Sequence, residues 1–133
     1  MRFSTRSTYG LRAMINLAEK ASNISLSQIS KEEHISRKYL EIIFAQLKKA
    51  KLIKSIKGAT GGYSLAKPAK DISVFEIIKA LERNMNVFHC VGSKGKVYCS
   101  QACDCRVNLV LAKVQNSVNK TLLDIKLSEL IKK

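Results

Sequence analysis

Four cysteines between positions 90 and 105 are the residues of this chain best suited to metal or redox chemistry. They are Cys90, Cys99, Cys103 and Cys105, which gives the spacing Cys-x8-Cys-x3-Cys-x-Cys. A zinc ribbon uses two Cys-x2-Cys pairs, and a common bacterial ferredoxin run repeats the same short unit. Neither pattern occurs here, so spacing alone leaves an iron–sulfur cluster, a zinc site and metal-free thiols open.

The rest of the chain offers little for catalysis. It contains two histidines, His34 and His89, and therefore few acid–base groups that titrate near neutral pH. His34 falls in a turn between two expected helices, where we expect it to be solvated. The glycine-rich stretch 58–62 lacks the Gly-Lys-Ser/Thr ending of a phosphate-binding loop. We do not expect an enzyme.

The charge balance favours a polyanionic partner. The 24 basic and 10 acidic side chains give a formal net charge of +14. The excess lies mainly in residues 1–70, which carry 14 basic and four acidic side chains. Because each Lys or Arg beside a phosphate releases condensed counterions, this distribution is typical of a protein that binds nucleic acid through its N-terminal half.

Length and hydropathy limit the architecture and the compartment. A chain of 133 residues can bury one hydrophobic core. No apolar run approaches the roughly 20 residues that span a bilayer, and the N-terminus lacks a secretory signal pattern. We therefore expect a cytoplasmic protein with no membrane partner, whose cysteines stay reduced unless they bind metal or serve in redox chemistry.

The elements that would position a binding site begin with three helices. Residues 6–21 place apolar side chains at helical spacing, and Ser25 starts a short helix that ends near Glu33. Ser36 is a plausible N-cap for a longer helix whose apolar stripe is Leu40, Ile43, Phe44 and Leu47. A tight turn between a shorter and a longer helix fits helix-turn-helix spacing, although an ordinary helical hairpin fits it too.

A basic hairpin follows this helix pair at once. Residues 53–57 and 62–65 are expected to form two short strands around three glycines, which permit a tight turn. The fold class expected is mainly α with a small β-hairpin wing, namely a winged helix-turn-helix with a long C-terminal dimerisation helix. We assign residues 1–83 to the DNA-binding domain and 84–133 to a cysteine loop and dimerisation helix, together forming one compact unit.

Two further helices are expected beyond the wing. Ser73 and Glu76 have capping-box spacing and open a helix that should bury Phe75, Ile78 and Leu81. Helical periodicity is lost between residues 84 and 102. It resumes from about Asp104 in a long helix whose apolar stripe suggests a partner helix, most economically in a homodimer, or else a cap on the monomer core. The stripe consists of Val107, Leu111, Val114, Val118, Leu122 and Ile125.

Three stretches of sequence together point to a known family. They are the opening Met1-Arg-Phe-Ser-Thr with Tyr9-Gly-Leu-Arg-Ala-Met14, the segment Ile35-Ser-Arg-Lys-Tyr-Leu-Glu41, and Ile56-Lys-Gly-Ala-Thr-Gly-Gly-Tyr-Ser-Leu65. They are similar to the corresponding segments of the bacterial Rrf2 family of transcription regulators. The last resembles that family's Arg-Gly-x-x-Gly-Gly-Tyr wing, and the resemblance covers nearly the whole chain.

The resemblance implies a homodimeric winged-helix regulator, here expected to be a repressor, on a roughly palindromic double-stranded DNA operator. Some family members sense iron–sulfur or redox status through a cluster, whereas others lack the cysteines and respond through a partner protein or a small molecule. Cluster-binding members carry three cysteines before the long helix, with five residues between the last two. Cys99 and Cys105 reproduce that gap, and Cys90 supplies the first ligand.

The cluster implied by this resemblance is of the 2Fe-2S type, with 4Fe-4S as the alternative. Cys103 is extra and could be a fourth ligand, a replacement for one of the three, or a thiol that forms a disulfide. Asn108 stands where some members have a ligating His, and His89 and Asp104 are candidates by proximity only. The fourth ligand is therefore unassigned, and a zinc site or thiol–disulfide switch on the same DNA-binding fold stays an alternative.

The DNA contacts expected in this class come from the second helix of the pair and from the wing. Arg can pair with guanine, and the carboxylate of Glu41 can accept from the cytosine amino group, unless it is a solvated partner of Lys38 or Lys48. Lys57 stands where the family usually has Arg. Tyr63 and Leu65 are expected in the core of the hairpin. The predicted DNA-binding residues are Ser36, Arg37, Lys38, Tyr39, Glu41, Lys57, Gly58 and Ala59.

Two other classes of protein explain less of the sequence. An iron–sulfur carrier or thiol oxidoreductase would use the cysteines but leave the basic helix and glycine-rich wing without a role. It would also lack a Cys-x2-Cys pair. An RNA-binding or general nucleoid protein would share the charge, but the chain has few aromatic residues for base stacking.

Overall fold

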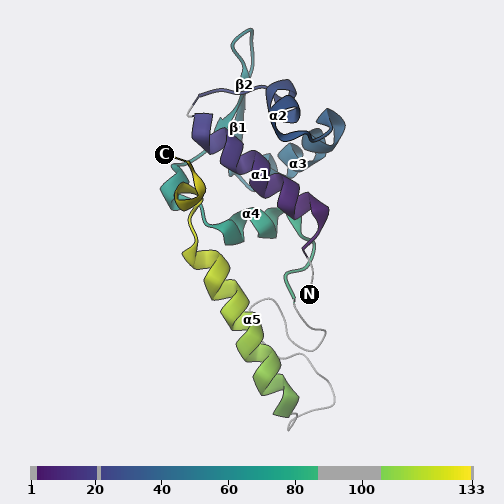
Figure 1. The fold of residues 1–133 in the computed structure, drawn as a ribbon, viewed down its shortest axis with the longest axis vertical. Coiled ribbons are helices and arrows are strands. Elements are labelled where there is room, and N and C mark those ends of the chain that lie inside the picture. The colour runs from purple at the N-terminus through teal and green to yellow at the C-terminus, as the bar shows by residue number, and fades with distance from the viewer. Residues whose placement is uncertain (1–2, 21, 87–105, 133) are drawn as a thin grey trace.

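The computed structural model describes residues 3–20, 22–86 and 106–132 (Figure 1). Helices α1 to α4 and the β1–β2 hairpin form a compact body, from which α5 extends as a long rod (Figure 1). The expected winged helix-turn-helix with a long C-terminal helix is confirmed. The elements are α1 (Thr5–Lys20), α2 (Leu26–Glu33), α3 (Arg37–Lys49), β1 (Ile53–Ile56), β2 (Gly62–Leu65), η1 (Ala69–Asp71), α4 (Val74–Leu81), α5 (Arg106–Asp124) and η2 (Leu127–Leu130).

Serine caps fix where three helices begin. The side chains of Ser25 and Ser36 accept hydrogen bonds from the backbone N–H groups of Gln28 and Tyr39, which opens α2 and α3. Ser73 and Glu76 form the complete capping box that their spacing predicts at α4. At α2 only half of that motif forms, because the Gln28 side chain donates to Glu32 instead of returning to the cap.

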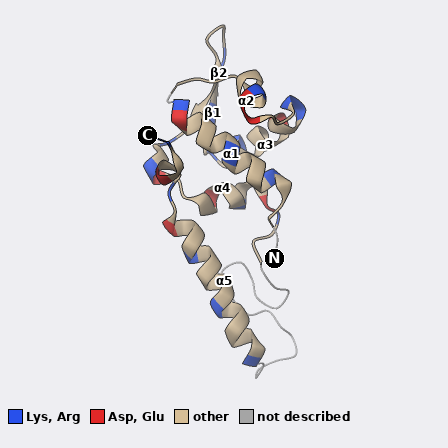
Figure 2. Cartoon of the chain, in the orientation of Figure 1, with Lys and Arg blue, Asp and Glu red and all other residues tan. Residues whose placement is uncertain are grey.

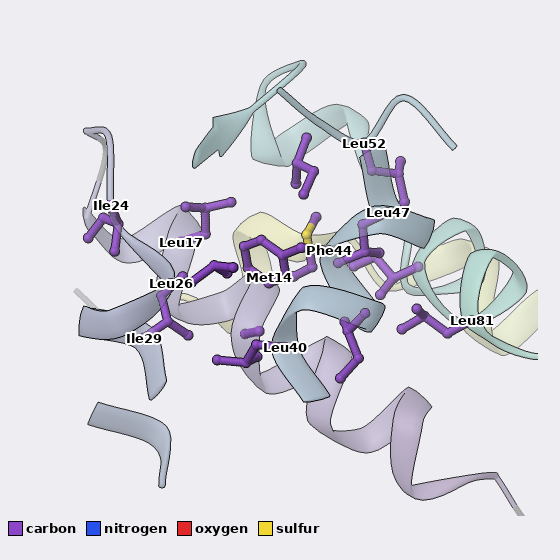
Figure 3. Packing of buried hydrophobic residues seen from close by; sticks show 14 of the residues in the cluster. Met14, Leu17, Ile24, Leu26, Ile29, Leu40, Phe44, Leu47, Leu52 and Leu81 are labelled. Carbon is purple, nitrogen blue, oxygen red and sulfur yellow. The ribbon is translucent and has the colours of Figure 1, made fainter. Parts of the chain in front are cut away.

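The core lies where α1, α2, α3 and α4 meet (Figure 3). The predicted stripe of α3 is fully buried, and Phe44 at its centre is 0% exposed. The ring of Phe44 packs edge-to-face on Tyr63 of β2, with 4.9 Å between ring centroids. This contact joins the helix that is expected to read DNA to the base of the wing, so the two elements share one packed interior.

The hairpin is an antiparallel pair with Ile53 opposite Leu65 and Ile56 opposite Gly62. Its second strand also pairs with the α1–α2 connection, because Ile24 and Tyr63 exchange two backbone hydrogen bonds of 3.0 and 2.8 Å. A Cβ atom at Gly62 would lie 2.6 Å from the carbonyl oxygen of Ile24, so only glycine permits this approach. Gly58 in the turn has a φ of 113°. Half-buried Tyr63 and Leu65 pack against the core, as predicted.

Helix α4 buries a different set of residues from the one expected. Ile78 and Leu81 are buried as predicted, together with Val74 and Ile77. Phe75 is only half-buried, so the expectation for this residue was wrong. It lies about 100° around the helix from Val74, off the buried face, and the Lys79 ammonium stands 5.9 Å from the centre of its ring.

Helix α5 is anchored to the body at its C-terminal end. The N–H of Val74 donates to the carbonyl of Ile125 at 2.9 Å, and the N–H of Leu127 donates to the carbonyl of Ile72 at 2.8 Å. Leu127, in the short helix η2, is 0% exposed within the core. The orientation of α5 is therefore coupled to α4 and, through the core, to α3.

The predicted apolar stripe of α5 is only partly covered, and its remaining member, Ile125, is half-buried like three of the others. Val107 and Val114 are 59% and 38% exposed, and Leu111, Val118 and Leu122 are half-buried. The buried side chains of α5 are instead polar, namely Asn108 and Gln115. The Gln115 amide donates to the backbone carbonyl of Met85 at 3.0 Å. The exposed part of the stripe, Val107 and Val114, is thus open to solvent.

Candidate nucleic-acid interface

The N-terminal half of α3 presents most of the side chains predicted to contact DNA. Ser36, Arg37, Lys38 and Glu41 are all exposed. Tyr39 is half-buried, and its ring packs edge-to-face on Tyr9 of α1, with 5.8 Å between centroids. Tyr39 therefore holds the start of α3 against α1, and only part of its side chain is accessible to a ligand.

Arg37 is held in place by two neighbours. One guanidinium nitrogen donates to the Ser27 hydroxyl of α2 at 2.8 Å, and another lies 3.7 Å from a carboxylate oxygen of Glu41. The partner of Glu41 in this structure is thus Arg37 and not Lys38 or Lys48. Both side chains are more than half exposed, and such helical pairs contribute only about 0.3–0.5 kcal/mol. The pairing with Glu41 is therefore weak and leaves Arg37 able to exchange it for another partner.

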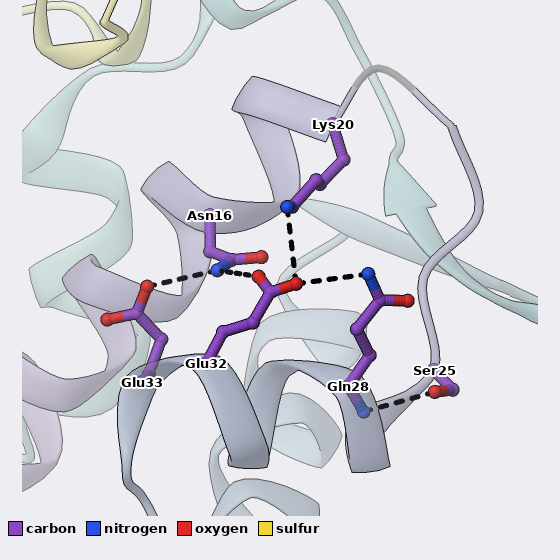
Figure 4. A network of polar contacts seen from close by, with 6 residues as sticks. All are labelled: Asn16, Lys20, Ser25, Gln28, Glu32 and Glu33. Atoms are coloured by element: carbon purple, nitrogen blue, oxygen red, sulfur yellow. Dashed lines mark hydrogen bonds and ion pairs between the residues drawn. The ribbon is translucent and has the colours of Figure 1, made fainter.

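A polar network fixes α2, the first helix of the pair, against α1 (Figure 4). The Asn16 amide donates to Glu32 at 2.8 Å and to Glu33 at 3.0 Å. Lys20 and Gln28 both reach the second oxygen of Glu32, at 3.2 and 3.0 Å. Sequence reasoning missed these residues, because their meeting depends on how the two helices pack and not on spacing within either one.

The network changes the acidity of Glu32. Hydrogen bonds from Asn16, then Gln28, then Lys20 lower the pKa of this carboxyl from 4.5 to about 2. Because the folded-state pKa lies below the unfolded value, the carboxylate contributes stability that is complete above pH 4.5. That contribution is lost progressively as the pH falls through about 2.

Replacing Glu32 by glutamine should therefore flatten the pH dependence of stability on the acid side. We expect the melting temperature of wild type to fall more steeply than that of Glu32→Gln between pH 4.5 and 2. Circular dichroism melts across this range measure the difference. Asp71→Asn, which removes an exposed carboxylate of η1 outside the network, should retain the wild-type slope. Parallel curves for wild type and Glu32→Gln would contradict the role given to Glu32.

The wing and the end of α3 carry the remaining predicted contacts. Lys57, Gly58 and Ala59 form the exposed hairpin turn, which projects from the body as its outermost loop (Figure 1). The ammonium of Lys48 donates to the Ser55 hydroxyl of β1 at 2.8 Å, which ties the end of α3 to the wing. Lysines accumulate around this junction, and all of them are exposed: Lys48, Lys49, Lys51, Lys54 and Lys57.

The charged residues are distributed unevenly along the chain (Figure 2). Along α3 the four basic residues lie in the first and last turns, and Glu41 is the one acidic residue. Arg37 and Lys38 begin the helix, and Lys48 and Lys49 end it. A helix with one face in solvent, cations at both ends and a basic hairpin next to its last turn can follow the phosphates on either side of a DNA groove.

One exposed residue of α3 was not among the predicted contacts. Ile42 is 48% exposed, although Leu40 and Ile43, which stand close to it in the sequence, are buried. The sequence contained a signal for this position, because Ile42 falls outside the 40, 43, 44, 47 spacing of the buried face.

The predicted metal ligands Cys90, Cys99, Cys103 and Cys105 lie outside the described residues, as do His89 and Asp104. Within the described ranges, no group of three or more His, Cys, Asp or Glu side chains is arranged to hold a metal ion. One described feature adjoins the cysteine segment. Asn108 in the first turn of α5 is 6% exposed, and its side-chain oxygen has no hydrogen-bond partner among the described residues.

Among the helices that the structure describes, none combines the length and the apolar character needed to cross a bilayer.

Comparisons with known proteins cover nearly the whole chain. Residues 3–133 match the family model Rrf2, described as an iron-dependent transcriptional regulator. The HTH-type transcriptional regulator IscR of Cereibacter sphaeroides is 40% identical over 107 residues, which cover 77% of this chain and 69% of that relative. These relatives are transcriptional regulators and not enzymes.

Solved structures show the same likeness in three dimensions. CymR, the global cysteine regulator of B. subtilis, superposes with a TM-score of 0.83 at 30% identity, covering 98% of this chain and 95% of that one. The IscR of T. potens superposes with a TM-score of 0.77 at 34% identity, covering 98% of this chain and 85% of that one.

Proposed function

Because the chain belongs to the Rrf2 family of transcriptional regulators, we propose that it is a homodimeric repressor that binds an operator in double-stranded DNA and responds to iron–sulfur or redox status through its cysteines. The observation that carries the DNA-binding part is the exposed N-terminal end of α3 together with a basic glycine-rich wing that Lys48 ties to the other end of the helix. A regulator that acts on the bacterial chromosome works in the cytoplasm.

In the proposed complex, α3 enters the major groove with its N-terminal residues against the base edges. Arg37 leaves its weak pairing with Glu41 and reads guanine, while Glu41 accepts from a cytosine amino group. Ser36 and Lys38 lie on the same exposed end, with Tyr39 supporting them. Lys57 with the backbone amides of Gly58 and Ala59 approaches phosphates or the minor groove from the wing.

Lysines near the end of α3 supply phosphate contacts in this proposal, so replacing Lys49 by alanine should weaken binding uniformly across DNA sequences. The slope of log affinity against log salt concentration should fall in magnitude by about 1, because one fewer counterion is released. Fluorescence anisotropy titrations at several salt concentrations measure the slope. Lys120→Ala, which removes an exposed cation of α5, is the matched control. An unchanged slope for Lys49→Ala would exclude a contact between Lys49 and a phosphate.

The exposed side of α5 supports a homodimer. Val107, Val110 and Val114 recur at helical spacing and are 59%, 61% and 38% exposed. An open apolar groove of about 290 Å³ lies further along α5, towards the C-terminal end of the helix. Pairing two copies along α5 would cover these side chains and bring two copies of α3 onto the half-sites of a palindromic operator. The groove is lined by Phe3, Ser117, Val118, Thr121 and Leu122.

The proposed cluster is held by the thiolates of Cys90, Cys99 and Cys105 and is of the 2Fe-2S type. Thiolate sulfur is the donor that iron–sulfur clusters use, and a bound cluster would supply a redox-sensitive, labile group. Asn108 lies three residues beyond Cys105, and its buried side-chain oxygen has no hydrogen-bond partner among the described residues, so a polar partner close to the proposed site would suit it. Cys103 remains available as an additional ligand.

A direct covalent path links this proposed site to the DNA-binding surface. Cys105 is followed at once by Arg106, the first residue of α5. Whatever holds Cys105 therefore also holds the start of α5, while the other end of α5 is anchored to α4 by backbone hydrogen bonds. Loss or oxidation of the cluster would release the N-terminal end of the helix and alter the spacing of the two α3 helices.

Anaerobic purification with a visible absorption spectrum and assays for iron, sulfide and zinc tests the proposed cofactor. We expect visible cluster bands with matching iron and sulfide, lost in Cys99→Ala and in Cys105→Ala. Cys103→Ala, which removes a thiol of the same segment, should retain them if three thiolates suffice. A colourless, iron-free protein would overturn the cluster and leave a zinc site or thiol switch on the same regulator.

A further inference from the structure

An apolar pair interrupts the polar surface of α3. Ile42 is 48% exposed and lies outside the core cluster, and Ala45, one turn further along, is exposed as well. Positions 38, 42, 45 and 49 fall on one stripe of a helix, so the pair lies between Lys38 and Lys49. The exposed half of the Ile42 side chain has no apolar cover from the residues that the structure describes, so it is available to an external partner.

The charges around Ile42 indicate what that contact is. Arg37, Lys38, Lys48 and Lys49 are the basic residues of α3, against the single acid Glu41. A complementary partner is therefore a polyanion, and among polyanions the major groove of B-form DNA admits a helix. The apolar group that this groove offers on its base edges is the 5-methyl group of thymine.

We propose that Ile42, flanked by Ala45, packs on the methyl group of one thymine in each operator half-site and thereby selects T·A over C·G at that position. This inference rests on the proposed function, since it presupposes that α3 lies in the major groove. Ile42 cannot hydrogen-bond a base edge, so a cytosine in the same place would lose water from its amino group without gaining a partner. Glu41, the preceding residue, has the opposite preference and would read a neighbouring base pair.

The test begins with an operator selected from a random pool of DNA duplexes by the wild-type protein. Each thymine of that operator is then replaced by deoxyuridine, which keeps the hydrogen-bonding edge and removes only the methyl group. We expect one position per half-site at which this replacement weakens wild-type binding by roughly 3- to 10-fold, the effect of losing about one buried methyl contact. Binding by Ile42→Ala should be insensitive to the replacement at that position.

Two matched variants separate methyl recognition from general weakening. Lys49→Ala should bind both duplexes less tightly and retain the full wild-type ratio between thymine and deoxyuridine. Ile42→Gln, selected on the same random pool, should lose the preference for thymine at that position. Melting temperatures of the Ile42 variants, measured by circular dichroism, should match wild type because the side chain is exposed.

The outcomes distinguish this inference from the proposed function. Recovery of no operator at all would overturn both. Recovery of an operator in which every deoxyuridine replacement affects wild type and Ile42→Ala equally would overturn the assignment of Ile42 alone. A position at which only the Ile42 variants lose sensitivity to the methyl group would establish it.

Discussion

Replacement of Phe44 by alanine is expected to lower the free energy of unfolding by about 3–5 kcal/mol. The side chain is 0% exposed and lies in the cluster that joins α1, α2, α3 and α4, so truncation removes buried apolar surface and leaves a cavity. It also removes the edge-to-face contact with Tyr63, through which α3 is packed against the wing. A domain of this size has a total stability of about 5–15 kcal/mol, so the loss is a large share of it.

Urea unfolding followed by circular dichroism, at one fixed protein concentration, measures this effect. Ile42→Ala is the matched control on the same helix: its side chain is exposed, and we expect a change within about 0.5 kcal/mol. Phe44→Leu changes the side-chain volume less than Phe44→Ala and should lower the free energy of unfolding by less. If the alanine variant does not fold, Phe44→Leu can be compared with Ile42→Ala instead. Equal stabilities of Phe44→Ala and Ile42→Ala would contradict the position of Phe44 at the centre of the core.

The parts of the fold that could be predicted from sequence are those fixed by neighbouring residues. The starts of α2, α3 and α4 follow from serine side chains that accept from backbone N–H groups three residues on, a contact within one turn. The hairpin follows from glycines that permit its turn, and its strands end within one residue of the expected positions. The buried stripe of α3 follows from helical periodicity alone.

The face that a helix buries was harder to predict where its packing partner lies far along the chain. On α5 the apolar stripe is only partly covered, and the buried side chains are Asn108 and Gln115. The backbone of Met85, 30 residues earlier, fixes Gln115 through a hydrogen bond. At α4, Val74 and Ile77 are buried in place of Phe75. Helical periodicity identifies a helix and its apolar stripe. It does not tell which other elements will pack on the helix, and so which face will be buried.

For the candidate interface, sequence predicted which residues would be exposed better than it predicted how they are held. Ser36, Arg37, Lys38 and Glu41 are on the surface as expected. The hydrogen bond from Arg37 to Ser27 and the attachment of Asn16 to Glu32 join separate helices, so no spacing within one helix reveals them. The roles of these residues and of the cysteines on DNA and metal stay predictions.

The exposed face of α5 gives the second large expected effect, on assembly and on DNA binding together. Val110 is 61% exposed on the apolar face of α5, between Val107 and Val114 in the N-terminal half of the helix. Replacing it by glutamate would bury one carboxylate from each copy in the apolar interface of the proposed dimer and desolvate both. We expect Val110→Glu to be a monomer at concentrations at which wild type is a dimer.

Loss of the dimer should weaken operator binding by on the order of 100-fold or more, because the second half-site is then no longer bound intramolecularly. Analytical ultracentrifugation gives the oligomeric state, and anisotropy titrations on full and half operators give the affinities. On a half operator, Val110→Glu and wild type should bind alike, since α3 is unchanged. Asn116→Glu adds the same charge at an exposed position on a different face of α5 and should remain dimeric. A dimeric Val110→Glu protein with wild-type affinity would show that the two copies meet elsewhere than on this face.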